Sequence, residues 1–136
     1  MTNLQSLSYY YPELILSGVI LGAIIYDLLI DKSKSGNVGW FLIAGLMAVA
    51  GAICLQDDTV TTLFTNAIVL DPFASFFKLL IVLATILVSV VSLQSGELSE
   101  YRKGEYFTLL GIIVFGLFLM VSTVDLIMVY ISIEIV

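Results

Sequence analysis

The 136 residues of this chain are 60% hydrophobic and only 12% charged, with a formal net charge of −6 and a mean hydropathy of +1.13. Soluble globular domains carry about a quarter of their residues as charged side chains, so this composition excludes a soluble domain. The acidic residues form no block of like charge, and nothing in their distribution indicates nucleic acid or a basic partner. The sequence therefore predicts an integral membrane protein.

The chain has no histidine and a single cysteine, Cys54. One cysteine excludes an intrachain disulfide and a cysteine-based metal centre. The missing histidine removes the commonest metal ligand and the commonest general base. We therefore expect no cofactor, no metal site and no catalytic residue in this chain.

Four apolar segments come close to the roughly 17 to 25 residues that a helix needs to cross a bilayer. Bounded by charged or turn-forming residues, they cover residues 14–30, 38–55, 73–93 and 106–121. No basic residue precedes the first segment, so we expect a mature first helix there and not a signal peptide. The sequence thus predicts an all-α protein with four transmembrane helices.

A fifth apolar segment covers residues 126–136 and follows the small and polar residues 122–125. It corresponds to about 17 Å of helix, too short to cross a bilayer core of about 30 Å. Joining it to the fourth segment would give a helix of about 46 Å, too long without severe tilt. We therefore predict a turn at 122–125, followed by the start of a fifth transmembrane helix.

The basic residues predict the orientation of these helices. Lys32 and Lys34 lie between the first two segments, and Arg102 and Lys103 lie between the third and fourth, whereas residues 56–70 contain no Lys or Arg. Cytoplasmic loops of membrane proteins carry an excess of Lys and Arg. The two basic loops are therefore predicted to be cytoplasmic and the amino terminus to be outside.

Glu134 is the main candidate for a functional residue. It lies nine residues after Asp125, which places it about 13.5 Å into the fifth segment and close to the bilayer midplane. A charged side chain at that depth costs roughly 2.5 to 3.5 kcal/mol on insertion scales. Its proton affinity would depend on burial and on any nearby lysine, so it is a candidate for proton translocation. The alternative is a structural hydrogen bond between helices.

Two further charged residues, Lys78 and Asp27, lie within apolar segments. We expect the long side chain of Lys78 to extend outward past Phe76 and Phe77 to the membrane interface, with a role in proton transfer as the alternative. Asp27 lies one turn from the inner end of the first segment. Placement at the interface is the favoured interpretation for it, and proton translocation is again the alternative.

Four stretches of the sequence occur in an order and at distances that resemble one known family. They are residues 11–16 (YPELIL), 71–80 (DPFASFFKLL), 104–110 (GEYFTLL) and 125–134 (DLIMVYISIE). Together they resemble subunit N of proton-pumping NADH:quinone oxidoreductase, which is respiratory complex I. Subunit N is one of the antiporter-like subunits of that complex. The resemblance covers essentially the whole chain.

The resemblance implies about fourteen helices in a complete subunit, with two inverted five-helix repeats that contain broken helices. The acidic residue of the fifth helix in that family matches Glu134 and is thought to pair there with a lysine on a later helix. That lysine and both broken helices are absent from these 136 residues. We therefore expect an amino-terminal portion of such a subunit, or a chain whose remainder a second polypeptide supplies. Lys78 matches no site carried over from the family.

The resemblance further implies a membrane-arm subunit that contributes to proton translocation coupled to quinone reduction. NADH, FMN, iron–sulfur clusters and quinone are then expected in partner subunits, and neighbouring antiporter-like subunits are the expected contacts in a bacterial inner membrane. One alternative is a subunit of a multisubunit cation/proton antiporter of the Mrp type. Another is a small structural or assembly membrane protein.

Overall fold

The structure, a computed structural model, describes residues 9–30, 36–56, 60–63, 67–96, 98–99 and 102–136. Their helices are α2 (Tyr11–Leu29), α3 (Gly36–Cys54), α4 (Pro72–Gln94), α5 (Lys103–Ser122) and α6 (Leu126–Ile135). The first four are long and apolar enough to cross a membrane, which confirms the predicted fold class of four such helices followed by a shorter fifth. Lys32 and Lys34, on which the predicted orientation partly depends, lie outside the described residues.

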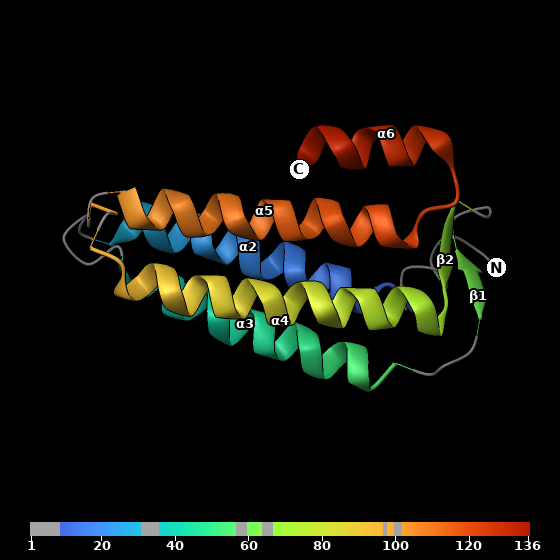
Figure 1. The fold of residues 1–136 in the computed structure, drawn as a ribbon, viewed down its shortest axis with the longest axis horizontal. Helices are drawn as coiled ribbons and strands as arrows, with labels where there is room; N and C mark the ends of the chain where they lie inside the picture. The colour runs from blue at the N-terminus through green and yellow to red at the C-terminus, as the bar shows by residue number, and fades with distance from the viewer. Residues whose placement is uncertain (1–8, 31–35, 57–59, 64–66, 97, 100–101) are drawn as a thin grey trace.

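The four long helices form a bundle, and α6 lies along the outside of α5 (Figure 1). Within the bundle α2 and α4 each pack against both α3 and α5. The chain turns back between α5 and α6, as the polar residues 122–125 predicted. A β-carbon on Gly116 of α5 would lie 2.9 Å from Ile135 and from Val136, so the end of α6 is level with the interior of α5 and not with its end.

Side chains at the starts of the helices explain where two of them begin. The Asp71 carboxylate accepts a hydrogen bond from the backbone N–H of Ala74 at 2.6 Å, and Pro72 occupies the first turn of α4. The Asp125 carboxylate does the same for Ile127 at the start of α6, at 2.9 Å. Aspartate in this position satisfies backbone N–H groups that have no partner within the helix.

A short antiparallel hairpin, which the sequence did not predict, precedes α4. Its strands are β1 (Thr61–Leu63) and β2 (Ile68–Leu70). The residue before β2, Ala67, accepts hydrogen bonds from the Thr123 hydroxyl at 3.0 Å and from the Val124 backbone N–H at 3.1 Å. The hairpin is therefore attached to the turn between α5 and α6, at the same end of the bundle as the start of α2 (Figure 1).

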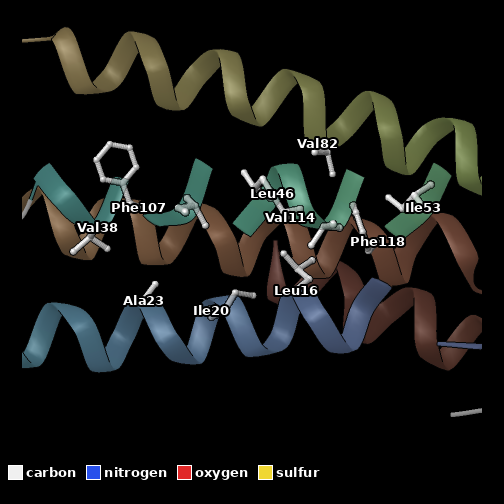
Figure 2. Close-up of a cluster of buried hydrophobic side chains, with 12 residues drawn as sticks. Leu16, Ile20, Ala23, Val38, Leu46, Ile53, Val82, Phe107, Val114 and Phe118 are labelled. Carbon is white, nitrogen blue, oxygen red and sulfur yellow. The ribbon is translucent and has the colours of Figure 1, made fainter. Parts of the chain in front are cut away.

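The core of the bundle is apolar and receives side chains from α2, α3, α4 and α5 (Figure 2). Leu16, Leu42, Leu46 and Phe118 in this cluster are fully buried. Close contacts between these buried side chains stabilise the bundle. Against this background, any charged group inside the bundle needs a partner.

Candidate functional site

The most unusual feature inside the bundle is a buried ion pair between α2 and α4. The Lys78 ammonium donates a hydrogen bond to Oε1 of Glu13, and each residue is only 1% exposed. The two residues are 65 positions apart in the chain. Removing either charge alone would leave the other one buried and uncompensated, which is far costlier than burying the pair.

The expected outward path of Lys78 past Phe76 and Phe77 is therefore wrong. Position 78 lies on the inner face of α4, together with the buried residues Ala74, Val82, Thr85 and Ser89. Phe76 and Phe77 lie on the exposed side of the same helix. The Lys78 side chain thus meets Glu13 inside the bundle and does not reach the interface.

The packing of α2 against α5 sets the surroundings of the pair. A β-carbon on Gly104 would overlap the Asp27 carboxylate, and one on Gly111 would lie 3.2 Å from Ile20. In this antiparallel register, each step of seven residues back along α2 matches seven residues forward along α5, so Glu13 lies opposite Phe118. The Lys78 ammonium lies 5.8 Å from the centre of the Phe118 ring, within the range of a cation–π contact.

Two hydroxyl groups extend this polar cluster toward the end of the bundle. Ser122 lies one helical turn beyond Phe118 on α5, and its side chain is buried. Tyr10 precedes α2 and is buried among Ile68, Leu70 and Leu119. Burial, followed by the nearby Glu13 carboxylate, raises the pKa of Tyr10 above its ordinary value. Tyr10 therefore remains a neutral phenol at neutral pH.

Glu134 lies in a different environment. It is exposed on α6, and the Tyr130 hydroxyl one turn earlier donates a hydrogen bond to its Oε1 at 2.9 Å. The opposite face of α6 meets α5 through residues such as Met128 and Ile135. The carboxylate thus points away from the four-helix bundle.

Asp27 is buried in the last turns of α2, against Gly104 near the start of α5. It also lines a shallow groove of about 360 Å³ between α2 and α5, together with Glu105. Fourteen residues of α5 separate Gly104 from Phe118, which corresponds to about 21 Å along the helix. Asp27 and the Glu13–Lys78 pair therefore lie near opposite ends of the bundle. The three candidates from the sequence, Glu134, Lys78 and Asp27, thus do not form one site.

Glu13 is the residue that sequence reasoning missed. It follows Pro12 at the start of α2, a position typical of an interfacial acid, and nothing in the local sequence distinguishes it from one. The available signal was depth: a lysine seven residues into one helix can reach back, through its long side chain, to an acid in the first turn of a neighbouring helix. Within the described residues, no group of three or more His, Cys, Asp or Glu side chains could hold a metal ion.

No protein-family model matches the chain. Among curated proteins it is 36% identical to NADH-quinone oxidoreductase subunit N of Anaeromyxobacter sp., over 98% of this chain and 26% of that protein. It is 35% identical to NADH-quinone oxidoreductase subunit N 2 of Chloroherpeton thalassium, over 95% of this chain and 26% of that protein. A NAD(P)H-quinone oxidoreductase subunit 2 from Nostoc is 28% identical, over 90% and 24% of the two chains.

The chain thus spans about a quarter of the length of the curated relatives that it matches. The matched region includes nearly all of the described helices, because the alignments cover at least nine-tenths of the chain. Over nearly all of its length, this chain is therefore similar to a part of NADH-quinone oxidoreductase subunit N.

Proposed function

We propose that this chain is an amino-terminal portion of a membrane-arm subunit of a proton-pumping NADH:quinone oxidoreductase and that it contributes to proton translocation coupled to quinone reduction. The observation that carries the proposal is the 36% identity to a subunit N over 98% of the chain. Four helices of membrane-spanning length and composition support it. Electron transfer itself belongs to partner subunits in this proposal.

The placement of the chain follows from the same proposal. NADH, FMN, iron–sulfur clusters and quinone would be bound by partner subunits, and neighbouring antiporter-like subunits would contact this chain. The membrane is proposed to be the bacterial inner membrane, with the amino terminus outside. The basic residues Arg102 and Lys103 at the start of α5 support this orientation, because Lys and Arg are enriched in cytoplasmic loops and this orientation places both residues on the cytoplasmic side.

Glu134 is the residue that we propose to handle the translocated proton. It lies on a face of α6 that the bundle leaves uncovered, so helices from the remainder of the subunit can pack there and supply a partner. The Tyr130 hydroxyl already orients the carboxylate. A carboxylate that gains and loses a charged partner changes its proton affinity, which is what a translocating group requires.

Lys78 and Asp27 have secondary places in the proposal. Lys78 is an ionisable group inside the bundle with a carboxylate partner, which is the kind of pair that proton pathways in membranes use. Asp27 lines a groove near the opposite end of α2 and α5, where it can exchange protons with the cytoplasmic side.

The test is Glu134→Gln in the assembled complex. We expect weaker proton pumping for each NADH oxidised, because the amide cannot bind and release the proton, while the amount of complex in the membrane changes little. Ile131→Leu is the control, since Ile131 is an exposed side chain of the same helix that carries no proton. Unchanged pumping by an assembled Glu134→Gln complex would remove the residue from the mechanism.

The alternative of a cation/proton antiporter is not favoured, because the relatives named above are quinone oxidoreductase subunits. Purification of the tagged chain from its native membrane separates the two. Copurification with NADH-oxidising and quinone-reducing subunits supports the proposal, and copurification with antiporter subunits alone contradicts it.

A further inference from the structure

The ion pair between α2 and α4 leaves one of its buried oxygens without a hydrogen-bond partner in the part of the chain that the structure describes. Lys78 bonds Oε1 of Glu13, whereas Oε2 is buried and has no hydrogen-bond partner among the described residues. The hydroxyl of Ser122 is in the same situation. A buried polar group without a partner costs about 1 to 3 kcal/mol, and buried waters commonly supply the missing bonds.

The register of α2 and α5 places these two atoms in one part of the bundle. Glu13 lies opposite Phe118, and Ser122 lies one turn beyond Phe118 toward the end of α5. The Lys78 ammonium faces the same Phe118 ring. Beyond Ser122 the chain enters the turn to α6, where Asp125 is exposed. Ser122 therefore lies between the ion pair and the surface at this end of the bundle.

We propose that Glu13, Lys78 and Ser122 form a proton-exchange site in which a buried water joins Oε2 of Glu13 to the Ser122 hydroxyl. The site takes up and releases its proton at the end of the bundle where α2 begins. It does so independently of Glu134, which lies on the far side of α5 and points away from the bundle.

The proton balance of the site is simple. A proton that arrives through the water binds Oε2 of Glu13 and gives a neutral carboxylic acid beside a charged ammonium. The bundle then contains one uncompensated positive charge, which apolar surroundings disfavour. Neutrality returns when the same proton leaves or when Lys78 releases one of its own. The pair can thus hold a proton for a time without binding a metal or a cofactor.

Few other groups could account for a pH response here. Tyr10, at the start of α2, faces Glu13 and stays neutral at neutral pH because burial raises its pKa. Phe118 and Ser122 are the facing residues of α5. The Asp71 carboxylate, at the start of α4, is bonded to the Ala74 N–H. The only titratable side chain of α3 is the exposed Cys54.

The first experiment uses the neutral double variant Glu13→Gln/Lys78→Met in the whole complex. The double variant removes both charges and leaves neither one uncompensated, so we expect it to assemble better than either single variant. Proton pumping should fall by about tenfold, which is less than the roughly 100-fold that a positioned acid or base contributes to a transfer step. Leu79→Met, on the exposed side of α4, is the matched control.

The second experiment tests the proton directly, and its serine variant keeps both charges of the pair, so that part does not depend on the double variant folding. Infrared difference spectra of the purified complex, between acidic and alkaline buffer, should contain a carboxylic acid band that Glu13→Gln/Lys78→Met abolishes. Ser122→Ala keeps both charges and should shift the frequency of that band, because the acid loses its water-mediated bond to the hydroxyl.

Two results would overturn the site. One is wild-type pumping by an assembled double variant, which would leave the pair as a structural link between α2 and α4. The other is the absence of any carboxylic acid band that depends on Glu13 and Ser122. This inference rests on the proposed function only for the pumping measurement. If the Glu134→Gln complex pumps normally, the role proposed for Glu134 is wrong. The infrared result still decides whether Glu13, Lys78 and Ser122 form a proton-exchange site.

Discussion

The four-helix bundle and α6 each contain a glutamate, and the two glutamates lie in opposite environments. Glu13 of the bundle is 1% exposed and paired with Lys78, whereas Glu134 of α6 is exposed and bonded only to Tyr130 within the described residues. Both carboxylates lie in apolar helices. The bundle supplies its own counter-charge, and α6 leaves room for one on a face that the bundle does not cover.

In the sequence, Glu13 and Glu134 are both acids within apolar segments, and only the structure shows which of them has a counter-charge. The effect of a carboxylate that is paired within the bundle depends on a partner that the structure identifies. A carboxylate on an uncovered face depends on whatever packs against it. The bundle is therefore expected to be sensitive to substitutions inside it, and α6 to be tolerant of substitutions that keep its contact with α5.

The largest effect is expected from Lys78→Met. The Glu13 carboxylate would stay buried without its counter-charge, which costs about 3 to 5 kcal/mol when one partner of a buried pair is removed. The thermal unfolding midpoint of the purified complex, or of its membrane arm, measures the loss. Leu79→Met on the exposed side should have little effect. Equal stability of the two variants would mean that the pair does not stabilise the bundle.

Gly104→Ala should have the next largest effect. The added β-carbon would overlap the Asp27 carboxylate, and overpacking of this kind typically costs about 1 to 3 kcal/mol. Gly18→Ala is the control, because a β-carbon at Gly18 meets no atom within 4 Å among the described residues. Adding Asp27→Ala to Gly104→Ala should recover part of the lost unfolding midpoint. If the second substitution lowers it further, steric overlap is not the cause.

A smaller and more local effect is expected from the two helix-capping aspartates. Loss of such a cap costs about 1 kcal/mol. Asp71→Ala should increase amide hydrogen exchange in α4 and in its bundle neighbours. Asp125→Ala should increase exchange in α6 with little change in α2, α3 and α4, because α6 packs mainly against α5. Matching exchange patterns for the two variants would contradict the distinction between bundle and α6.

The smallest effect is expected from Tyr130→Phe. The hydroxyl bonds an exposed carboxylate, so its loss should change the unfolding free energy by less than about 0.5 kcal/mol. Proton pumping is the more informative measurement, since the carboxylate of Glu134 would lose its orienting partner. A large drop in stability would show that Tyr130 is covered in the complex by another element.

The long helices could be predicted because the length of each apolar segment can be counted directly in the sequence. The polar residues 122–125 also predicted the turn before α6 correctly. The hairpin β1–β2 escaped prediction because strands of three residues leave too short a pattern to recognise. Its attachment to Thr123 depends on contacts between residues 56 positions apart, which no local pattern indicates.

The Glu13–Lys78 pair escaped for a different reason. Depth along a helix can be counted from the sequence, but the direction in which a side chain points depends on which face of the helix is inside the bundle. Lys78 shares its face with Ala74, Val82, Thr85 and Ser89, and that mixture of small, apolar and hydroxyl residues has no clear period of polarity. The roles predicted for Glu134, Lys78 and Asp27 stay predictions until the variants are measured.

The hairpin also bears on how the chain enters the membrane. Ala67 is made well before Thr123, and the two are joined by hydrogen bonds at one end of the bundle. During synthesis the hairpin segment would already be in place when α5 reaches that side. It can then hold the last turn of α5 and direct the following residues back along it. In this way two hydrogen bonds outside the helices would help to fix the point at which the chain reverses before α6.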